Sequence, residues 1–168
     1  MNHTSMTGFP ICAALVGQGR NRMILRKYET DADKEVERQL GAKYVEFVDP
    51  NCYVKEQPFL STYDFRIFDL TSDDFKGWLE VKKKAGSFSY NEMIPITKWN
   101  FAEHSPLPCY LLIERATEAM LFRISELVKR RVGEEREIKR REDQPGGSRK
   151  VVFFPSSEGQ LIYFVAST

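Results

Sequence analysis

Two acidic residues and a lysine on two strand-like segments are the residues of this sequence best suited to do chemistry. Asp64 lies in the apolar segment 63–70, and Glu80 and Lys82 lie in the segment 78–82. Side chains of a strand alternate between its two faces, so Glu80 and Lys82 should project together while their apolar neighbours enter a core. The seven residues between the segments are polar and rich in turn-forming types, which predicts a hairpin that brings Asp64 to the same place.

Two carboxylates and one ammonium group in such a cluster have a defined chemistry. Clustered carboxylates repel each other unless a cation lies between them, and an oxygen-only ligand set favours Mg²⁺ or Mn²⁺. Such a metal acidifies a bound water and stabilises charge on phosphorus, while a lysine orients the water or neutralises the phosphate. These residue types therefore indicate phosphodiester hydrolysis. On its own, Glu80-Val81-Lys82 is more commonly a surface ion pair.

A helix that carries acidic residues is predicted upstream. Thr30 is its N-cap, Asp33 is the capping-box partner three residues later, and Gly41 is the expected end. Asp33 and Glu37 share a neighbouring face one turn apart. The buried stripe is expected to consist of apolar residues spaced by four: Ala32, Val36 and Leu40. The following segment 43–48 alternates like a half-buried strand.

The acid, the hairpin and the motif Leu79-Glu80-Val81-Lys82 together resemble the D…(D/E)XK signature of the PD-(D/E)XK nuclease superfamily. Members usually have an upstream helix with an acid, then two residues, an apolar residue, three residues and a leucine, and Asp33 begins such a series here. The superfamily prefers Glu at that position, so Glu37 is the alternative. The resemblance is closer to small nuclease-like proteins of bacteriophages, and it covers the chain from about Tyr28 to the end. It departs from them in lacking a proline just before Asp64 and in having Ser148 inserted before Arg149.

The resemblance implies an α/β fold with a restriction-endonuclease-like core, in which helices flank a mixed central β-sheet, over a single domain of residues 1–168. It implies Mg²⁺ or Mn²⁺ as cofactor and cleavage of DNA, or of RNA, by an endonuclease that could act as a homodimer. The implied catalytic residues are Asp64, Glu80 and Lys82. The implied metal ligands are Asp33, Asp64, Glu80 and the main-chain carbonyl of Val81.

Contacts to nucleic acid are expected from basic residues around this site. Lys84 has the same strand parity as Lys82, and Lys98 lies on a helix expected within 88–105. A basic segment of about 126–150 contains Arg140 and Arg149 and is predicted to be an exposed helix or mobile loop, which binds phosphates or is simply solvated. The net charge is only +1, so the arrangement of charges must create any surface for a polyanion. Trp99 and Tyr90 could stack on a base, although most aromatic residues should belong to the core.

The rest of the sequence predicts further strands and a location in the cytoplasm, that of the host cell if a phage encodes the chain. Segments 109–113 and 119–124 are expected to pair, as are 151–154 and 161–164. The apolar segment 9–17 is too short to span a membrane and is interpreted as a buried strand. Three widely spaced cysteines indicate reduced thiols. The sequence is also compatible with two other functions: a catalytically inactive nucleic-acid-binding module of the same fold, and a small protein-interaction domain.

Overall fold

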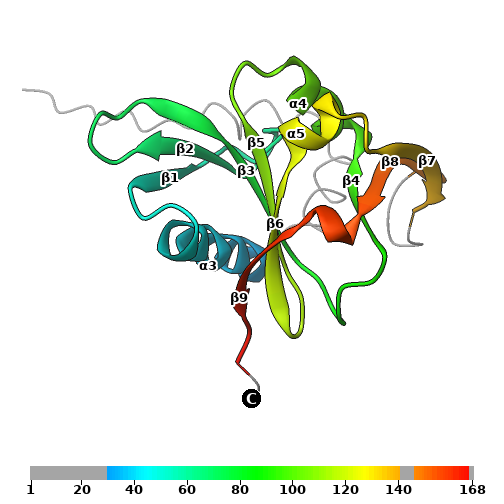
Figure 1. The fold of residues 1–168 in the computed structure, drawn as a ribbon, viewed down its shortest axis with the longest axis horizontal. Helices are drawn as coiled ribbons and strands as arrows, with labels where there is room; N and C mark the ends of the chain where they lie inside the picture. The colour runs from blue at the N-terminus through cyan, green and yellow to red at the C-terminus, as the bar shows by residue number, and fades with distance from the viewer. Residues whose placement is uncertain (1–29, 141–145, 167–168) are drawn as a thin grey trace, which may run out of the picture.

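The computed structural model describes residues 30–140 and 146–166, which form an α/β fold with two sheets (Figure 1). The larger sheet is mixed, because β3 and β5 are parallel while its other neighbouring strands are antiparallel. Its six strands, in spatial order, are β1 (Cys52–Glu56), β2 (Phe65–Asp69), β3 (Phe75–Lys83), β5 (Cys109–Glu114), β6 (Glu118–Arg123) and β9 (Gln160–Phe164). The smaller, antiparallel sheet has the order β4 (Asn91–Pro95), β8 (Ser148–Pro155) and β7 (Glu134–Lys139).

Both faces of the larger sheet are covered. Helix α3 (Asp31–Phe47) packs on one face, and α4 (Ile96–His104), α5 (Ile124–Lys129) and the smaller sheet lie on the other (Figure 1). The central strand β5 shows this directly, because Leu112 packs in the core beneath α3 while Leu111 and Ile113 belong to the opposite core. A short 3₁₀ helix, η1 (Ser156–Glu158), connects β8 to β9.

Helix α3 begins as predicted but is longer than predicted. Thr30 and Asp33 form the capping box, whereas Gly41 does not end the helix and the strand expected at 43–48 is helical as far as Phe47. Gly41 is buried against Phe65, and a Cβ at this position would lie 3.0 Å from the Phe65 ring. The glycine therefore permits close packing of helix on sheet. The buried stripe includes Leu40 and continues to Tyr44, but Ala32 is exposed.

The two strand pairs that the central sheet depends on are confirmed, and a third is wrong. Strands β2 and β3 form the expected antiparallel hairpin, and β5 pairs with β6. The helix expected within 88–105 is α4. Segments 151–154 and 161–164 do not pair with each other: β8 pairs with β4 and β7, and β9 pairs with β6.

The basic segment 126–150 is not one exposed helix or loop. It contains the end of α5 and the strand β7, which pairs with β8 in antiparallel register. Residues 1–29, 141–145 and 167–168 are not described, so the strand predicted at 9–17 falls outside the described residues. Among the helices of residues 30–140 and 146–166, none is long and apolar enough to cross a membrane.

Candidate active site

The β2–β3 hairpin places Asp64 beside Glu80. Phe65 pairs with Leu79 in the antiparallel register, so Asp64, one residue earlier, lies opposite Glu80, one residue later. Oδ2 of Asp64 accepts a 3.0 Å hydrogen bond from the backbone N–H of Val81. Leu79 and Val81 are buried on the α3 side, and strand alternation directs Glu80 to the opposite face. The two predicted acids thus meet where the ladder between β2 and β3 ends.

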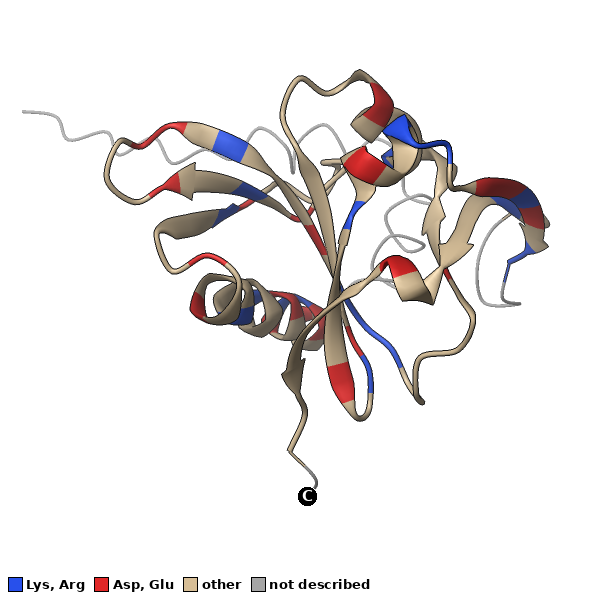
Figure 2. Cartoon of the chain, in the orientation of Figure 1, with Lys and Arg blue, Asp and Glu red and all other residues tan. Residues whose placement is uncertain are grey.

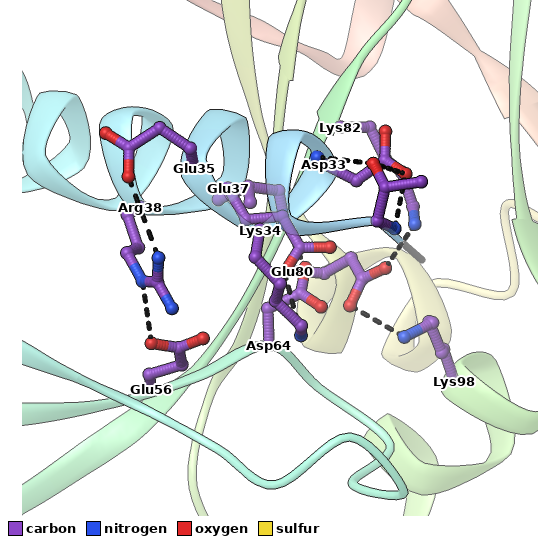
Figure 3. Close-up of polar contacts among 12 residues, drawn as sticks. Asp33, Lys34, Glu35, Glu37, Arg38, Glu56, Asp64, Glu80, Lys82 and Lys98 are labelled. Atoms are coloured by element: carbon purple, nitrogen blue, oxygen red, sulfur yellow. Dashed lines mark hydrogen bonds and ion pairs between the residues drawn. The ribbon is translucent and has the colours of Figure 1, made fainter. Parts of the chain in front are cut away.

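Two lysines bind the carboxylate of Glu80, which has 0% exposed surface (Figure 3). Nζ of Lys82 lies 2.9 Å from Oε1, and Nζ of Lys98 lies 2.6 Å from Oε2. Lys82 comes from the same strand, whereas Lys98 comes from the first turn of α4. The sequence predicted Lys98 as a nucleic-acid contact, and the structure places it as a direct partner of a predicted catalytic acid.

Lys98 also joins α4 to the residues that precede Asp64. Its ammonium group donates a hydrogen bond to the carbonyl of Thr62 and lies 5.4 Å from the centre of the Tyr63 ring. In return, the hydroxyl of Tyr63 donates a 3.0 Å hydrogen bond to the carbonyl of Lys98. These contacts fix the position of Lys98 relative to both acids.

The electrostatics of the site lower the pKa of Glu80 and raise that of Asp64. Burial, together with the charge of Glu80, raises the pKa of Asp64 from 3.8 to about 7. Burial also acts to raise the pKa of Glu80, but the two lysines outweigh it and hold this pKa below its usual value. The charge of Glu80, and then that of Asp64, raises the pKa of Lys82. The arrangement is therefore an ionised buried carboxylate beside one that binds a proton readily.

The acid on α3 that approaches this site is Glu37. Its charge contributes to the raised pKa values of Asp64 and Lys82, and Nζ of Lys34 pairs with it at 3.2 Å. Asp33, the predicted metal ligand, instead uses Oδ2 to accept two 2.9 Å hydrogen bonds from the backbone and hydroxyl of Thr30. These hydrogen bonds lower the pKa of Asp33. Asp33 thus has a structural role at the helix N-terminus, and the effect of the Glu37 charge on the pKa values of Asp64 and Lys82 favours Glu37 as the helix acid.

A cleft of about 560 Å³ opens between β3 and the smaller sheet, with Glu80 in its wall. Glu80 is the single acid among the lining residues, which include five basic side chains: Lys82, Lys84, Lys139, Arg140 and Arg149. On α3 and β7 acidic and basic residues are mixed (Figure 2), whereas the lining of the cleft is mostly basic, which the net charge of the chain does not indicate. Three residues predicted to contact nucleic acid therefore line the same cleft: Lys84, and, more than 50 residues later in the sequence, Arg140 and Arg149.

No family model and no curated protein matches the sequence. The function of the site therefore has to be inferred from its geometry and chemistry. The relationship to the PD-(D/E)XK superfamily stays a prediction.

The two carboxylates fit a divalent cation that keeps most of its waters. Oε1 of Glu80 forms a 2.9 Å ion pair with Lys82, and Asp64 lies beside Glu80. Mg²⁺ is commonly bound through one or two carboxylates and several waters. No cluster of three or more His, Cys, Asp or Glu side chains suited to a metal occurs in residues 30–140 and 146–166. The carbonyl of Val81 points to the same edge of β3 as its N–H, so it would be the additional protein ligand.

A second buried carboxylate near the cleft was not recognised from the sequence. Glu92 of β4, 2% exposed, binds Lys84 at 2.8 Å and Arg115 at 2.6 Å. Lys84 therefore lines the cleft with its charge already paired. Strand parity correctly predicted which way Lys84 points, but Glu92 and Arg115 are 23 residues apart, and no local pattern joins them.

Proposed function

We propose that this chain is a metal-dependent nuclease of the PD-(D/E)XK type, with a restriction-endonuclease-like core, that hydrolyses phosphodiester bonds within DNA. One observation carries the proposal: the fully buried Glu80 lies beside Asp64 and on a cleft lined by five basic residues. Burying a carboxylate costs several kcal/mol, and a surface that only bound phosphates would gain nothing from an acid facing them. Support also comes from the mixed sheet and from the acidic helix α3 beside the hairpin.

The side chains would divide the work as follows. Asp64 and Glu80 would hold Mg²⁺ or Mn²⁺, with the carbonyl of Val81 as a further ligand. The bound cation would supply Lewis acidity, which makes a water more acidic and offsets charge on the phosphate. Lys98 keeps Glu80 ionised from the α4 side. Lys82 is 44% exposed, so its ammonium group can reach a phosphate oxygen in the cleft.

The remaining basic residues of the cleft would bind the phosphates on either side of the reacting one. Lys139 is the last residue of β7, and Arg140 follows it directly. Arg149 lies on the neighbouring strand β8. Contacts of this kind position a nucleic-acid backbone without reading its sequence. The smaller sheet would thus act as a phosphate-binding wall opposite the two acids.

One observation favours a second candidate, an inactive nucleic-acid-binding module of the same fold. Both oxygens of Glu80 are already paired with lysines, an arrangement that is also found in purely structural ion clusters. A module of this kind would keep the basic cleft and bind DNA without cutting it. A protein-interaction domain, the third alternative, would not bind DNA at all.

Cleavage of supercoiled plasmid in Mg²⁺, in Mn²⁺ and in EDTA tests the proposal. The wild type is expected to nick the plasmid with either metal, and Glu80→Gln and Lys82→Ala should each reduce the rate by about 100-fold or more. Lys150→Ala is the matched control, because Lys150 is an exposed lysine of β8 that lines neither the cleft nor the site. DNA binding without cleavage in Mn²⁺ would support the inactive module, and absence of both would support a protein-interaction domain.

A further inference from the structure

A second cavity of about 540 Å³ adjoins the candidate active site, between α4 and the start of β3. Its volume falls in the range of roughly 300–1,000 Å³ that is typical of small-ligand sites. Three aromatic side chains, Phe75, Trp78 and Phe101, form its wall, and Asn100 and His104 of α4 add polar atoms. Such a composition suits a flat, partly polar ring system.

An exposed arginine, Arg66, lies against two of these aromatic rings but is not itself among the residues that line the cavity. The ring of Trp78 meets the rings of Phe75 and Phe101 edge to face, at 5.1 Å between centres in both cases. The guanidinium group of Arg66 lies 5.0 Å from the centre of Trp78 and 5.3 Å from that of Phe75. Within the part of the chain that the structure describes, Arg66 forms no ion pair with a carboxylate. Its charge is therefore available to an anion bound beside the aromatic rings.

Arg66 and the ring of Trp78 lie next to Asp64 and Glu80 along the β2–β3 hairpin. Arg66 pairs with Trp78 in the β2–β3 register, and the pair formed by Asp64 and Glu80 is the next one on the same face. Two residues of a strand span about 7 Å. The ring of Tyr63 links the two places, because it contacts Trp78 and Phe101 and its hydroxyl binds the backbone of α4.

We propose that this cavity is a subsite for an unpaired nucleobase of single-stranded nucleic acid, next to the nucleotide whose phosphate lies at Asp64 and Glu80. The proposal rests on the nuclease function for its substrate class. Aromatic side chains with an adjacent arginine bind the faces of unstacked bases, whatever their sequence. Bases inside a duplex are already stacked on their neighbours and cannot enter. The charge of Arg66, which no carboxylate of residues 30–140 and 146–166 pairs with, favours a ring attached to a phosphate over an apolar peptide side chain.

The aromatic residues expected from the sequence to stack on a base do not form this subsite. Trp99 is partly buried and packs against the core, with its ring so close to Gly133 that a Cβ there would lie 2.6 Å from it. Tyr90 is 93% exposed and lines neither of these two cavities. Trp78 instead combines a cavity, an arginine partner and proximity to the acids.

Binding of fluorescently labelled oligothymidylate and of a duplex of equal length, both in EDTA, tests the proposal without any need for cleavage. Arg66→Ala is expected to weaken single-strand binding about tenfold and to affect duplex binding no more than the control Lys150→Ala does. Arg66→Lys, which keeps the charge but loses the planar group, should weaken it partly. Oligouridylate in place of oligothymidylate shows whether the subsite accepts RNA as well as DNA.

A second readout uses the intrinsic fluorescence of Trp78 in a Trp99→Phe background whose folding is checked by circular dichroism. Single strands should quench this fluorescence and duplex should not. Equal losses for Arg66→Ala and Lys150→Ala, or equal quenching by duplex, would overturn the subsite. Quenching by single strands but not by duplex would support the subsite. If the same protein cut no DNA, the result would count against the nuclease function and not against the subsite.

Discussion

At the scale of single residues, the defining feature is a buried carboxylate whose charge is maintained by two lysines. Glu80 is completely buried, and Lys98 is only 16% exposed. A buried charge that loses one partner is strongly destabilising, because the remaining charge is left without compensation. The lysines therefore contribute to stability as well as to the site.

Replacement of Lys98 by Met should lower the free energy of unfolding by about 2–3 kcal/mol, a little less than for a fully broken pair because Lys82 still binds Glu80. Urea denaturation of the wild type and the variant measures this difference. In the double variant with Glu80→Gln the two effects should not add, because the lysine and the acid belong to one interaction. Additive losses would show that Lys98 stabilises the fold independently of Glu80.

The raised pKa of Asp64 predicts a pH-dependent stability in the absence of divalent metal. The folded state keeps the proton of Asp64 up to about pH 7, whereas the unfolded state releases it near pH 3.8. The unfolded state therefore binds fewer protons in this interval, so stability should fall as the pH rises from about 4 to 7. Compared with wild type, Asp64→Asn should gain roughly 4 kcal/mol at pH 8 relative to pH 4, at about 1.4 kcal/mol per pKa unit. Urea denaturation at both pH values measures this, and an equal difference at the two would contradict the assignment.

At the scale of secondary-structure elements, two acids of α3 have different roles: one caps the helix, and the other acts on the candidate active site. Asp33 holds the first turn through Thr30, while the charge of Glu37, one turn later, contributes to the raised pKa values of Asp64 and Lys82. Spacing in the sequence alone left both acids as candidates. The capping box distinguishes them, because one carboxylate cannot close the helix N-terminus and point into the site.

Asp33→Ala should therefore destabilise the protein by about 1 kcal/mol and leave metal-dependent cleavage close to that of the wild type. Glu37→Gln should have the opposite profile, with little change in stability and a loss of cleavage of about tenfold or more. Thermal unfolding and initial cleavage rates, measured on both variants, give the comparison. If Asp33→Ala lost activity in proportion to Glu80→Gln while remaining folded, Asp33 would be the acid of the site after all.

The elements that build the centre of the fold were predictable because their signals are local. Alternation and turn residues gave the β2–β3 hairpin, and with it the neighbouring positions of Asp64 and Glu80. Predictions failed where tertiary contacts overrule local signals. Helix α3 continues through Gly41, which packs closely against Phe65. The strand β7 could not be recognised in its charged segment, because this edge strand of the smaller sheet has almost no buried residues and so no apolar alternation.

At the scale of the whole molecule, the two sheets together create the basic cleft. Glu92 of β4 binds Lys84 after β3 and Arg115 after β5, so a buried ion cluster fixes the smaller sheet beside the larger one. Within this cluster the charge of Lys84 is paired with that of Glu92. The sequence identified most of the basic residues but not this geometry, because the contacts connect segments that are far apart in the chain.

The cleft predicts a specific salt dependence of DNA binding. Each phosphate contact contributes a slope of about −0.9 in a plot of log affinity against log salt concentration. Combined replacement of Lys139 and Arg140 by Ala should remove about two phosphate contacts and make the slope correspondingly shallower. Lys150→Ala should leave the slope unchanged. Fluorescence anisotropy titrations in EDTA at several salt concentrations measure these slopes. Identical slopes for all three proteins would place the DNA outside the cleft.

The most direct test of the central claim is the initial rate at which the protein nicks supercoiled plasmid in Mg²⁺, compared between wild type and Glu80→Gln. Glu80→Gln keeps the size of the side chain but removes the charge that would hold the metal. If Asp64 and Glu80 form a catalytic metal site, the wild type nicks the plasmid, EDTA stops it, and Glu80→Gln loses about 100-fold or more of the rate. A folded wild-type protein that leaves the plasmid intact in both Mg²⁺ and Mn²⁺, or a Glu80→Gln variant that cuts as fast as wild type, would contradict it.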